Sequence, residues 1–426
     1  MYNILALILA GGRGKRMDIF CRHRAKPALP FAGTARVIDF TLSNCIHSLT
    51  RNIAVLIDYH RTGIASYLNR WAAANGASDF HLLEPRFGSY QGTADAVYQN
   101  IDFLKKDPSD LVMVLAGDHI YKMDYFRMVD HHRQSGADAT IGVVSVPIAQ
   151  AYRFGIVTVD DTSRVTGFIE KPEIPQSDLV SMGIYVFNKQ VLIDRLIEDA
   201  ALPSSPHDFG HAVMPRMVKR YNVSAYNFQG YWRDIGTPQV YYESNMELLP
   251  HAPSFVLNGN WPVLTEPNHL APPRISPQGS VQNSIVSPGC VIKGHVVNSV
   301  LSPGVWVEEE ATVRDSVIMA NSFIGYHTVI DHCVLSEGVN VGRLCYLGFG
   351  SSVAPAENIT VVGDDTTVPP HTAIGRNCRI LPHTGLGDFT GTVVPSDSVM
   401  SPQPARKILG IEEGEAGNIS KRLRAY

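Results

Sequence analysis

The chain of 426 residues carries a net charge of −4, with 45% hydrophobic and 18% charged residues. This is the balance of an ordinary globular protein, and the length exceeds what one hydrophobic core usually serves, so we expect two domains. The slightly acidic charge argues against a protein that binds nucleic acid through bulk electrostatics.

The six cysteines include no C-x-x-C pair, which argues against a zinc ribbon and against a secreted disulfide framework. No basic leader precedes the first apolar segment, and no apolar run approaches the ~18 residues of a membrane helix. We therefore expect a cytoplasmic protein that binds neither nucleic acid nor membranes.

Up to about residue 245, short apolar runs alternate with amphipathic stretches. A helix is predicted over 93–105, where Val97, Ile101 and Leu104 recur at helical spacing and Thr93 can cap the first turn. The alternation of predicted strands and helices is typical of an α/β domain with a mostly parallel sheet. The predicted strands are 4–10, 53–57, 111–116, 139–146, 184–187 and 223–228.

The first predicted strand runs directly into a loop of glycines and cations, "GGRGKR" at 11–16. The first 36 residues hold seven Lys or Arg against one acid, Asp18. Glycines at a strand end let backbone N–H groups approach an anion, and cations add charge. We therefore predict a phosphate-binding loop in which Arg13, Arg16 and Lys26 contact a polyphosphate.

Two familiar phosphate loops do not fit this segment. A Walker loop needs Ser or Thr after Gly14-Lys15, where this chain has Arg16. A dinucleotide fingerprint that starts at Gly12 needs a small residue where Met17 stands. The segment is therefore a phosphate loop that is neither a Walker loop nor a dinucleotide fingerprint.

A proline-rich segment separates this region from one with a different period, because residues 250–277 contain seven of the 27 prolines. The segments "NSIV", "NSVL", "DSVI" and "HCVL" then begin 15, 17 and 17 residues apart. Three hexapeptides make a coil of ~18 residues, so each segment marks a slightly trimmed coil of a parallel β-helix. The apolar residues that recur every six positions include Val317, Phe323, Val329, Leu335, Val341, Leu347 and Val353, and then Val362, Val368, Ile374 and Ile380.

The motifs "LILAGGRGKRM", "RAKPALPF", "YQGTADAVYQN", "VLAGDHIYKMDY", "FIEKP", "SMGIYVF", "SSPHDFG" and "YWRDIGT" occur in this order. On them the chain resembles the glucose-1-phosphate adenylyltransferases of bacterial glycogen and plant starch synthesis. The resemblance implies a Rossmann-like nucleotidyltransferase domain (1–249), a connector (250–280) and a C-terminal left-handed parallel β-helix of hexapeptide repeats (281–426). It also implies an allosteric homotetramer, with or without a regulatory paralogue.

In such an enzyme the phosphate of glucose 1-phosphate attacks the α-phosphorus of ATP, and pyrophosphate leaves. Asp118 follows a strand at the edge where a parallel sheet binds ligands, although it could instead cap a following helix. The resemblance implies that Asp118 and Asp234 bind Mg²⁺, and that Arg16, Lys26 and Asp118 are catalytic.

The resemblance also implies two substrate sites. The residues expected at the nucleotide are Gly11, Gly12, Arg13, Gly14, Tyr90, Gly92 and Thr93. The residues expected at glucose 1-phosphate are Tyr90, Gly155, Glu170, Lys171 and Ser181.

The match departs from the family at three positions that are implicated in regulation. His23 stands where members activated by fructose 1,6-bisphosphate carry Lys, and Asp58 and Ser89 replace a glutamine and a tryptophan. We therefore expect weak or altered activation by this effector.

Two alternative functions remain open on the sequence. One is a sugar nucleotidyltransferase that uses UTP or dTTP, with or without an acyltransferase site in the solenoid. The other is a non-catalytic regulatory subunit, which the presence of Lys26, Asp118, Lys171 and Asp234 argues against. The segment "DFG" at 208–210 lacks the companion motifs of a kinase magnesium loop.

Overall fold

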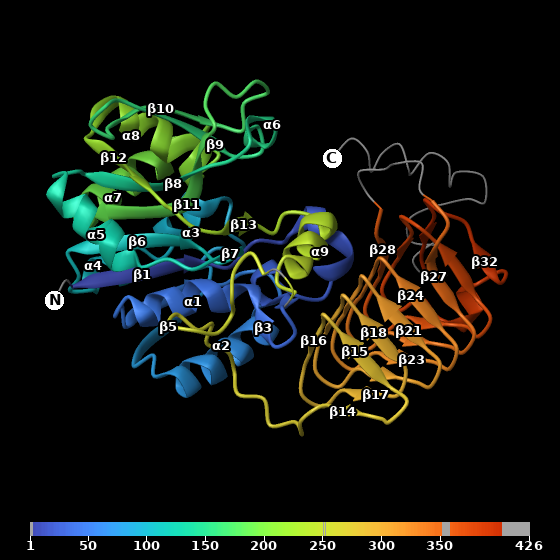
Figure 1. Ribbon diagram of the computed structural model, residues 1–426. Coiled ribbons are helices and arrows are strands. Elements are labelled where there is room, and N and C mark those ends of the chain that lie inside the picture. Colours follow the sequence, from blue (N-terminus) through green and yellow to red (C-terminus); the bar gives the residue numbers. More distant parts are fainter. Residues whose placement is uncertain (1–2, 250, 252, 352–357, 403–426) are drawn as a thin grey trace.

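The computed structural model describes residues 3–249, 251, 253–351 and 358–402. An N-terminal α/β domain lies beside a C-terminal solenoid of short strands, and helix α9 (Pro238–Met246) lies where the two meet (Figure 1). In the described residues, no helix is long and apolar enough to span a membrane.

The N-terminal domain is built on a nine-stranded sheet. Its strands are β1 (Ile4–Leu9), β4 (Asn52–Leu56), β5 (Asp79–Leu83), β6 (Leu111–Ala116), β8 (Ala139–Ser145), β9 (Gly155–Val159), β10 (Val165–Glu170), β11 (Leu179–Asn188) and β12 (Val223–Asn227). The order is β10-β9-β11-β6-β1-β4-β5, and β8 joins β11 to β12. Strands β5, β4, β1 and β6 are parallel, whereas β11 runs antiparallel to β6 and β8. All six predicted strands are present.

Helices cover both faces of this sheet, as expected for strands that are apolar on both sides. Along β1, Ala6 and Ile8 pack in one core with α1 (Val37–His47) and α2 (Arg61–Asn75), whereas Leu5 and Leu7 pack in the other with α7 (Lys189–Ala200) and α8 (Met214–Arg220). The helices of the domain are α1 (Val37–His47), α2 (Arg61–Asn75), α3 (Thr93–Tyr98), α4 (Ile101–Lys106), α5 (Tyr125–Gln134), α6 (Ile148–Ala151), α7 (Lys189–Ala200), α8 (Met214–Arg220) and α9, with the π-helix η3 (Phe209–Val213) and the 3-10 turns η1 (Lys15–Phe20) and η2 (Lys26–Ala28).

The helix predicted over 93–105 is present as two short helices, α3 and α4, with a break at Gln99 and Asn100. Thr93 is not the N-cap, which is Gly92. The Thr93 hydroxyl instead donates a hydrogen bond to Asp208 at 2.8 Å. A tertiary contact has therefore replaced the local cap that the sequence predicts.

Four short strands complete the domain. They are β2 (Pro30–Phe31) with β3 (Ala35–Arg36), and β7 (His119–Tyr121) with β13 (Trp232–Asp234). The antiparallel pair β7 and β13 places His119 opposite Asp234. This pair joins the segment that follows β6 to one more than a hundred residues later.

Three parallel sheets form the solenoid, as expected for a left-handed β-helix of hexapeptides. The first contains β14 (Arg274–Ile275), β17 (Val291–Ile292), β20 (Trp306–Val307), β23 (Phe323–Ile324), β26 (Asn340–Val341) and β29 (Thr367–Val368). The second contains β15 (Ser280–Gln282), β18 (His295–Val297), β21 (Thr312–Arg314), β24 (Val329–Asp331), β27 (Tyr346–Phe349), β30 (Ala373–Gly375) and β32 (Val393–Val394). The third contains β16 (Ile285–Val286), β19 (Val300–Leu301), β22 (Val317–Ile318), β25 (Cys333–Leu335), β28 (Thr360–Val362), β31 (Arg379–Ile380) and β33 (Val399–Met400), and the turn η4 (Leu386–Asp388) lies before β32.

A trimmed coil shifts the inward-facing positions along the sequence. Ile318 pairs with Leu335 in the next coil, 17 residues later, and Ile324 pairs in the same way with Val341. These four side chains are fully buried, whereas Phe323, from the row of six-residue intervals, is 37% exposed. The residues at intervals of six therefore change from outward-facing to inward-facing positions where a coil has 17 residues rather than 18. Val353, the last member of that row, lies outside the described residues.

One hydrophobic core spans the boundary between the two domains. It combines side chains of the segment after the first loop, such as Phe20 and Phe31, with Tyr241 of α9 and solenoid residues such as Val317 and Val334. Arg24 also pairs with two solenoid acids, Glu337 at 2.8 Å and Asp364 at 2.6 Å. The expected boundaries at 249 and 280 remain a prediction, although the first solenoid strand already begins at Arg274.

Candidate active site

The loop after β1 turns back sharply at Gly14, which has φ of +60°. A methyl group at Gly14 would lie 2.9 Å from the Cys21 sulfur and 3.2 Å from Cβ of Lys26. Only glycine meets both the left-handed backbone and this close approach. The turn leaves Gly12, Arg13 and Arg16 exposed, so the cations face solvent as a phosphate loop requires.

Lys26 lies at the centre of the predicted site, between the two predicted metal ligands. Its buried ammonium is 2.7 Å from Asp118 Oδ2 and 3.0 Å from Asp234 Oδ1. Burial disfavours a charged lysine, but the two carboxylates outweigh burial and raise the pKa of Lys26. For Asp234, burial acts to raise the pKa, but the charges of Lys26, His119 and Arg16 hold this pKa well below its usual range.

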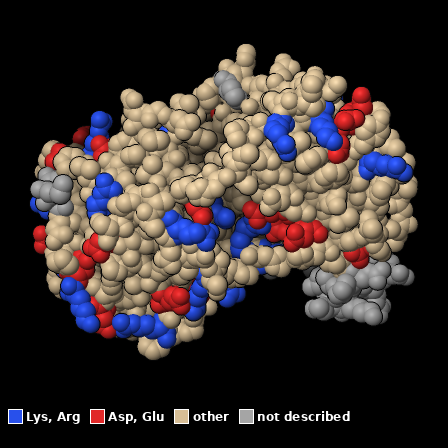
Figure 2. All heavy atoms as spheres, turned by 90° about the horizontal axis from the view of Figure 1, so that it is seen from below, with Lys and Arg blue, Asp and Glu red and all other residues tan. Residues whose placement is uncertain are grey.

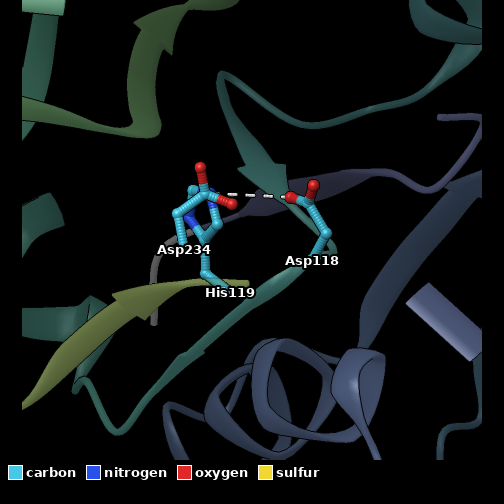
Figure 3. A group of neighbouring side chains, drawn as sticks. All are labelled: Asp118, His119 and Asp234. Atoms are coloured by element: carbon cyan, nitrogen blue, oxygen red, sulfur yellow. Dashed lines mark ion pairs between the residues drawn. The ribbon is translucent and has the colours of Figure 1, made fainter. Parts of the chain in front are cut away.

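The strand pair β7 and β13 brings the two aspartates together. Asp234 ends β13, and Asp118 is followed directly by strand β7 rather than by a helix, so Asp118 is not a helix cap. Figure 3 shows the side chains of Asp118, His119 and Asp234 directed into one space, with their ligand atoms within 4.8 Å of one another. His119 Nε2 is 3.5 Å from Asp118, and its buried Nδ1 has no hydrogen-bond partner in the described chain.

The predicted sugar site is lined by two glycines that make room for Glu170. A methyl group would lie 2.7 Å from Glu170 Oε2 if placed on Gly155, and 2.5 Å from it if placed on Gly210. The Glu170 carboxylate also contacts the Lys171 ammonium at 3.1 Å. Lys171 itself has φ of +46°, and its backbone N–H donates to the Phe154 carbonyl at 3.0 Å.

Hydroxyl groups lie near the same carboxylate. The Ser181 hydroxyl on β11 is 3.4 Å from that of Tyr185, and both side chains are buried. Burial raises the pKa of Tyr185, and the neighbouring negative charges of Glu170 and Asp208 also raise it. A set of carboxylates and hydroxyls is suited to hydrogen bonds with sugar hydroxyls.

On the nucleotide side, Gly92 packs directly on the backbone of the loop before η3. A methyl group there would lie 2.3 Å from the His207 carbonyl oxygen, so no other residue fits. The same oxygen accepts hydrogen bonds from the Ala94 and Asp95 backbone N–H groups at 2.9 and 3.1 Å. The hydrogen bond from Thr93 to Asp208 also connects the segment after Gly92 to the loop that precedes η3, near Glu170.

Tyr90 lies between this segment and the glycine loop. Its ring is 3.4 Å from a methyl group placed on Gly11, and its hydroxyl accepts a hydrogen bond from Asn100 at 3.0 Å. Burial raises the pKa of Tyr90 to about 12, so its hydroxyl stays protonated near neutral pH.

Two of the three predicted regulatory residues contact functional segments. Asp58 accepts the Tyr90 backbone N–H at 3.2 Å and pairs with Arg61 at 3.1 Å. The His23 ring lies 4.9 Å from the ring of His383 in the solenoid. Ser89 is an exposed residue next to Tyr90.

The sequence interpretation missed several residues that line the candidate site. His119 had a signal, since it directly follows Asp118, and Trp232 lies two residues before Asp234. Asp208 belongs to the "DFG" segment that has no kinase companions, yet its side chain ties Thr93 to the loop beside Glu170. Arg153 begins the segment "RFG", in which the sequence interpretation assigned only Gly155 to the site.

The face of the molecule in Figure 2 carries no single broad area of one charge. On the face in Figure 2, basic and acidic side chains are interspersed and most of the surface is neither. All six cysteines are unpaired and buried.

The chain is similar to known proteins over most of its length. A model of the family described as nucleotidyl transferase matches residues 5–250, and one described as GlmU-like, C-terminal hexapeptide matches residues 267–368. Glucose-1-phosphate adenylyltransferases of Acetivibrio thermocellus and Thermomicrobium roseum are each 41% identical to the chain, over 92% and 94% of it and over 96% and 98% of their own lengths. That of Bacillus cereus is 39% identical over 83% of the chain and 96% of its own length.

The charge cluster predicts a pH-dependent stability. Replacement Lys26→Met leaves two neighbouring carboxylates without their cation, at a cost of roughly 3–5 kcal/mol at pH 8. Lys26 is the largest of the charges that lower the pKa of Asp234 against the effect of burial, so we expect its removal to raise that pKa. The variant then regains stability relative to the wild type as the pH falls through the raised pKa. The loss in melting temperature, measured by thermal denaturation in EDTA, should therefore shrink from pH 8 to pH 5.

The matched control is Lys105→Met, which removes an exposed lysine from α4. It should change the melting temperature little at either pH. An equal loss for Lys26→Met at both pH values would contradict the charge cluster.

Proposed function

The chain belongs to the glucose-1-phosphate adenylyltransferases, and we propose that it transfers the adenylyl group of ATP to α-D-glucose 1-phosphate at a site centred on Lys26, Asp118 and Asp234. The products are ADP-glucose and pyrophosphate. The observation that carries the assignment of the site is the contact of one buried ammonium with two carboxylates from distant segments.

The reaction needs no nucleophile from the protein. A phosphate oxygen of glucose 1-phosphate attacks the α-phosphorus of ATP, and the bond from that phosphorus to the bridging oxygen of the β-phosphate breaks. A sugar phosphate whose second pKa is near ~6 is already largely dianionic at neutral pH, so no general base is needed either. What remains costly is to bring two polyanions together and to stabilise the charge on the leaving group.

The cations of the chain would provide this electrostatic stabilisation. Arg13 and Arg16 extend from a glycine turn whose backbone can approach the triphosphate, and Lys26 adds a charge held at a fixed position. Lys26 is already ordered by two carboxylates before substrate binds, so little reorganisation is needed during the reaction.

Asp118 and Asp234 would hold a divalent cation, which we propose to be Mg²⁺. Both offer carboxylate oxygens, the ligands that Mg²⁺ prefers, and each uses only one oxygen for Lys26. When bound, the ion neutralises phosphate charge and polarises the phosphoryl oxygen. The positions of Lys26 and Arg16 then decide where the triphosphate lies relative to that ion.

On the sugar side, Glu170 and Ser181 would accept and donate hydrogen bonds to the glucose hydroxyls, and Lys171 would bind the phosphate. An ammonium on a flexible stem suits a monophosphate. Gly155 keeps the Glu170 carboxylate accessible, since any side chain there would collide with it.

Three further expectations stay proposals. The solenoid would mediate a homotetramer, with or without a regulatory paralogue, because its outer strands expose apolar side chains such as Phe323 and Tyr346. Activation by fructose 1,6-bisphosphate would be weak or altered, since His23 and Asp58 carry the changes already noted. A cytoplasmic location would fit six unpaired cysteines.

The direct test of the function is pyrophosphate release from glucose 1-phosphate with ATP, UTP, dTTP, CTP and GTP in parallel. ATP should give the highest kcat/KM, and EDTA should abolish release. Preference for UTP or dTTP would instead favour another sugar nucleotidyltransferase, and no release with any nucleotide would favour a regulatory subunit.

Replacement Asp118→Ala should lower kcat by roughly two or more orders of magnitude and raise the Mg²⁺ concentration needed for half-maximal rate, because a metal-binding carboxylate is lost. Initial rates over a Mg²⁺ titration measure both. The control Asp161→Ala, an exposed acid in the turn after β9, should behave as the wild type. Full turnover by a folded Asp118→Ala protein would refute the metal assignment.

Replacement Lys171→Ala should chiefly raise the KM for glucose 1-phosphate and leave that for ATP nearly unchanged, because the lysine is assigned to the sugar phosphate alone. Steady-state kinetics with each substrate varied in turn separate the two constants. Lys219→Ala, at an exposed lysine in the last turn of α8, is the control. A larger effect on the KM for ATP would reverse the assignment of the two sides of the site.

A further inference from the structure

Arg153 lies beside the candidate metal site, although the sequence assigns a role only to its neighbour Gly155 in the segment "RFG". It follows α6 and precedes β9, and its guanidinium extends to Gly236, two residues after Asp234. A methyl group placed on Gly236 would lie 3.6 Å from Arg153 Nη2, 3.5 Å from Arg16 Nη2 and 3.6 Å from Asp234 Oδ2. Two guanidinium groups from distant segments therefore both approach Gly236, beside a predicted metal ligand.

Within the described chain, Asp234 is an acid that lies beside both arginines, but it forms no ion pair within 4 Å with either of them. Among the residues that the structure describes, neither Arg16 nor Arg153 forms an ion pair or a side-chain hydrogen bond, and Arg153 only approaches the Phe154 ring at 5.8 Å. Two like charges in one place repel each other, so an arrangement of this kind is suited to an anion that both can contact.

The surroundings of Arg153 indicate which anion this is. The carbonyl of the next residue, Phe154, accepts the backbone N–H of Lys171, and Gly155 lies opposite Glu170 in the β9–β10 pair. Arg153 and Lys171 therefore flank the same end of two paired strands. Arg153 lies on the side of the proposed sugar phosphate, whereas Arg16 extends from the loop proposed to bind the triphosphate.

The guanidinium also has open space before it. Arg153 and Asp234 both line a cavity of about 530 Å³, together with Trp232. Trp232 packs against Phe154, the residue after Arg153, with ring centroids 5.2 Å apart. A planar guanidinium in this position can donate two parallel hydrogen bonds to a phosphate, which a lysine cannot do.

We propose that Arg153 binds the phosphate of glucose 1-phosphate together with Lys171 and holds it toward Arg16 and the metal-binding aspartates. This proposal rests on the proposed function, since it assigns a further binding residue to the same reaction. Arg153 makes no bond to the leaving pyrophosphate, and it takes no proton.

The test compares Arg153→Ala and Arg153→Lys with the wild-type protein in both directions of the reaction. In the forward direction, Arg153→Ala should raise the KM for glucose 1-phosphate about 10- to 100-fold, as expected when a charged hydrogen bond is lost, with the KM for ATP unchanged. Arg153→Lys should give an intermediate KM, because the charge remains and the two parallel donors do not. In the reverse direction, the KM for pyrophosphate should stay at the wild-type value.

A matched control is Arg164→Ala, which removes an exposed arginine at the opposite end of the β9–β10 pair and should leave all three constants unchanged. A rise in the KM for pyrophosphate or for ATP, or an unchanged KM for glucose 1-phosphate in Arg153→Ala, would overturn the proposal. If Arg153→Ala does not fold, as judged by its melting temperature, Arg153→Lys decides by the same criteria. An inactive wild-type protein would refute the proposed function itself, which is a different result.

Discussion

The pairing of two three-residue strands, β7 and β13, is the constraint on which the candidate site depends. It sets His119 opposite Asp234 and so brings Asp118 and Asp234 to the two sides of Lys26. Two partly buried carboxylates this close together would repel each other, and the ammonium of Lys26 between them replaces that repulsion with two attractive ion pairs. The cluster is thus an ordered set of charges to which a triphosphate and a divalent ion can be added.

The same lysine is connected to the solenoid through a short stretch of chain. Arg24, two residues before Lys26, is paired with Glu337 and Asp364 of the solenoid, and the shared hydrophobic core surrounds the segment on both sides. The position of Lys26 therefore depends on the contact between the domains as well as on the sheet. A solenoid joined in this way acts as more than a spacer, because its packing contributes to the geometry of the charge cluster.

Much of the fold follows from local patterns in the sequence. The apolar runs predict the six strands, and the trimmed repeat predicts coils of 17 residues, which β22 and β25 confirm. The placement of Asp118 follows from its position after β6. Its contact with Asp234 does not, because β7 and β13 are too short to show a period and their partners are distant in sequence. Thr93 and Asp208 illustrate the same limit, since a tertiary hydrogen bond replaced the local cap. Arg153 was not predicted for a similar reason, because its meeting with Arg16 at Gly236 exists only in the folded chain.

The most direct measurement is a crystal structure of the protein with Mg²⁺ and ADP-glucose. It should show oxygens of Asp118 and Asp234 about 2.0–2.1 Å from the ion, with Lys26 and Arg16 beside the phosphates. A nucleotide bound elsewhere, with Asp118 and Arg16 both far from any phosphorus atom, would contradict the assignment of the site.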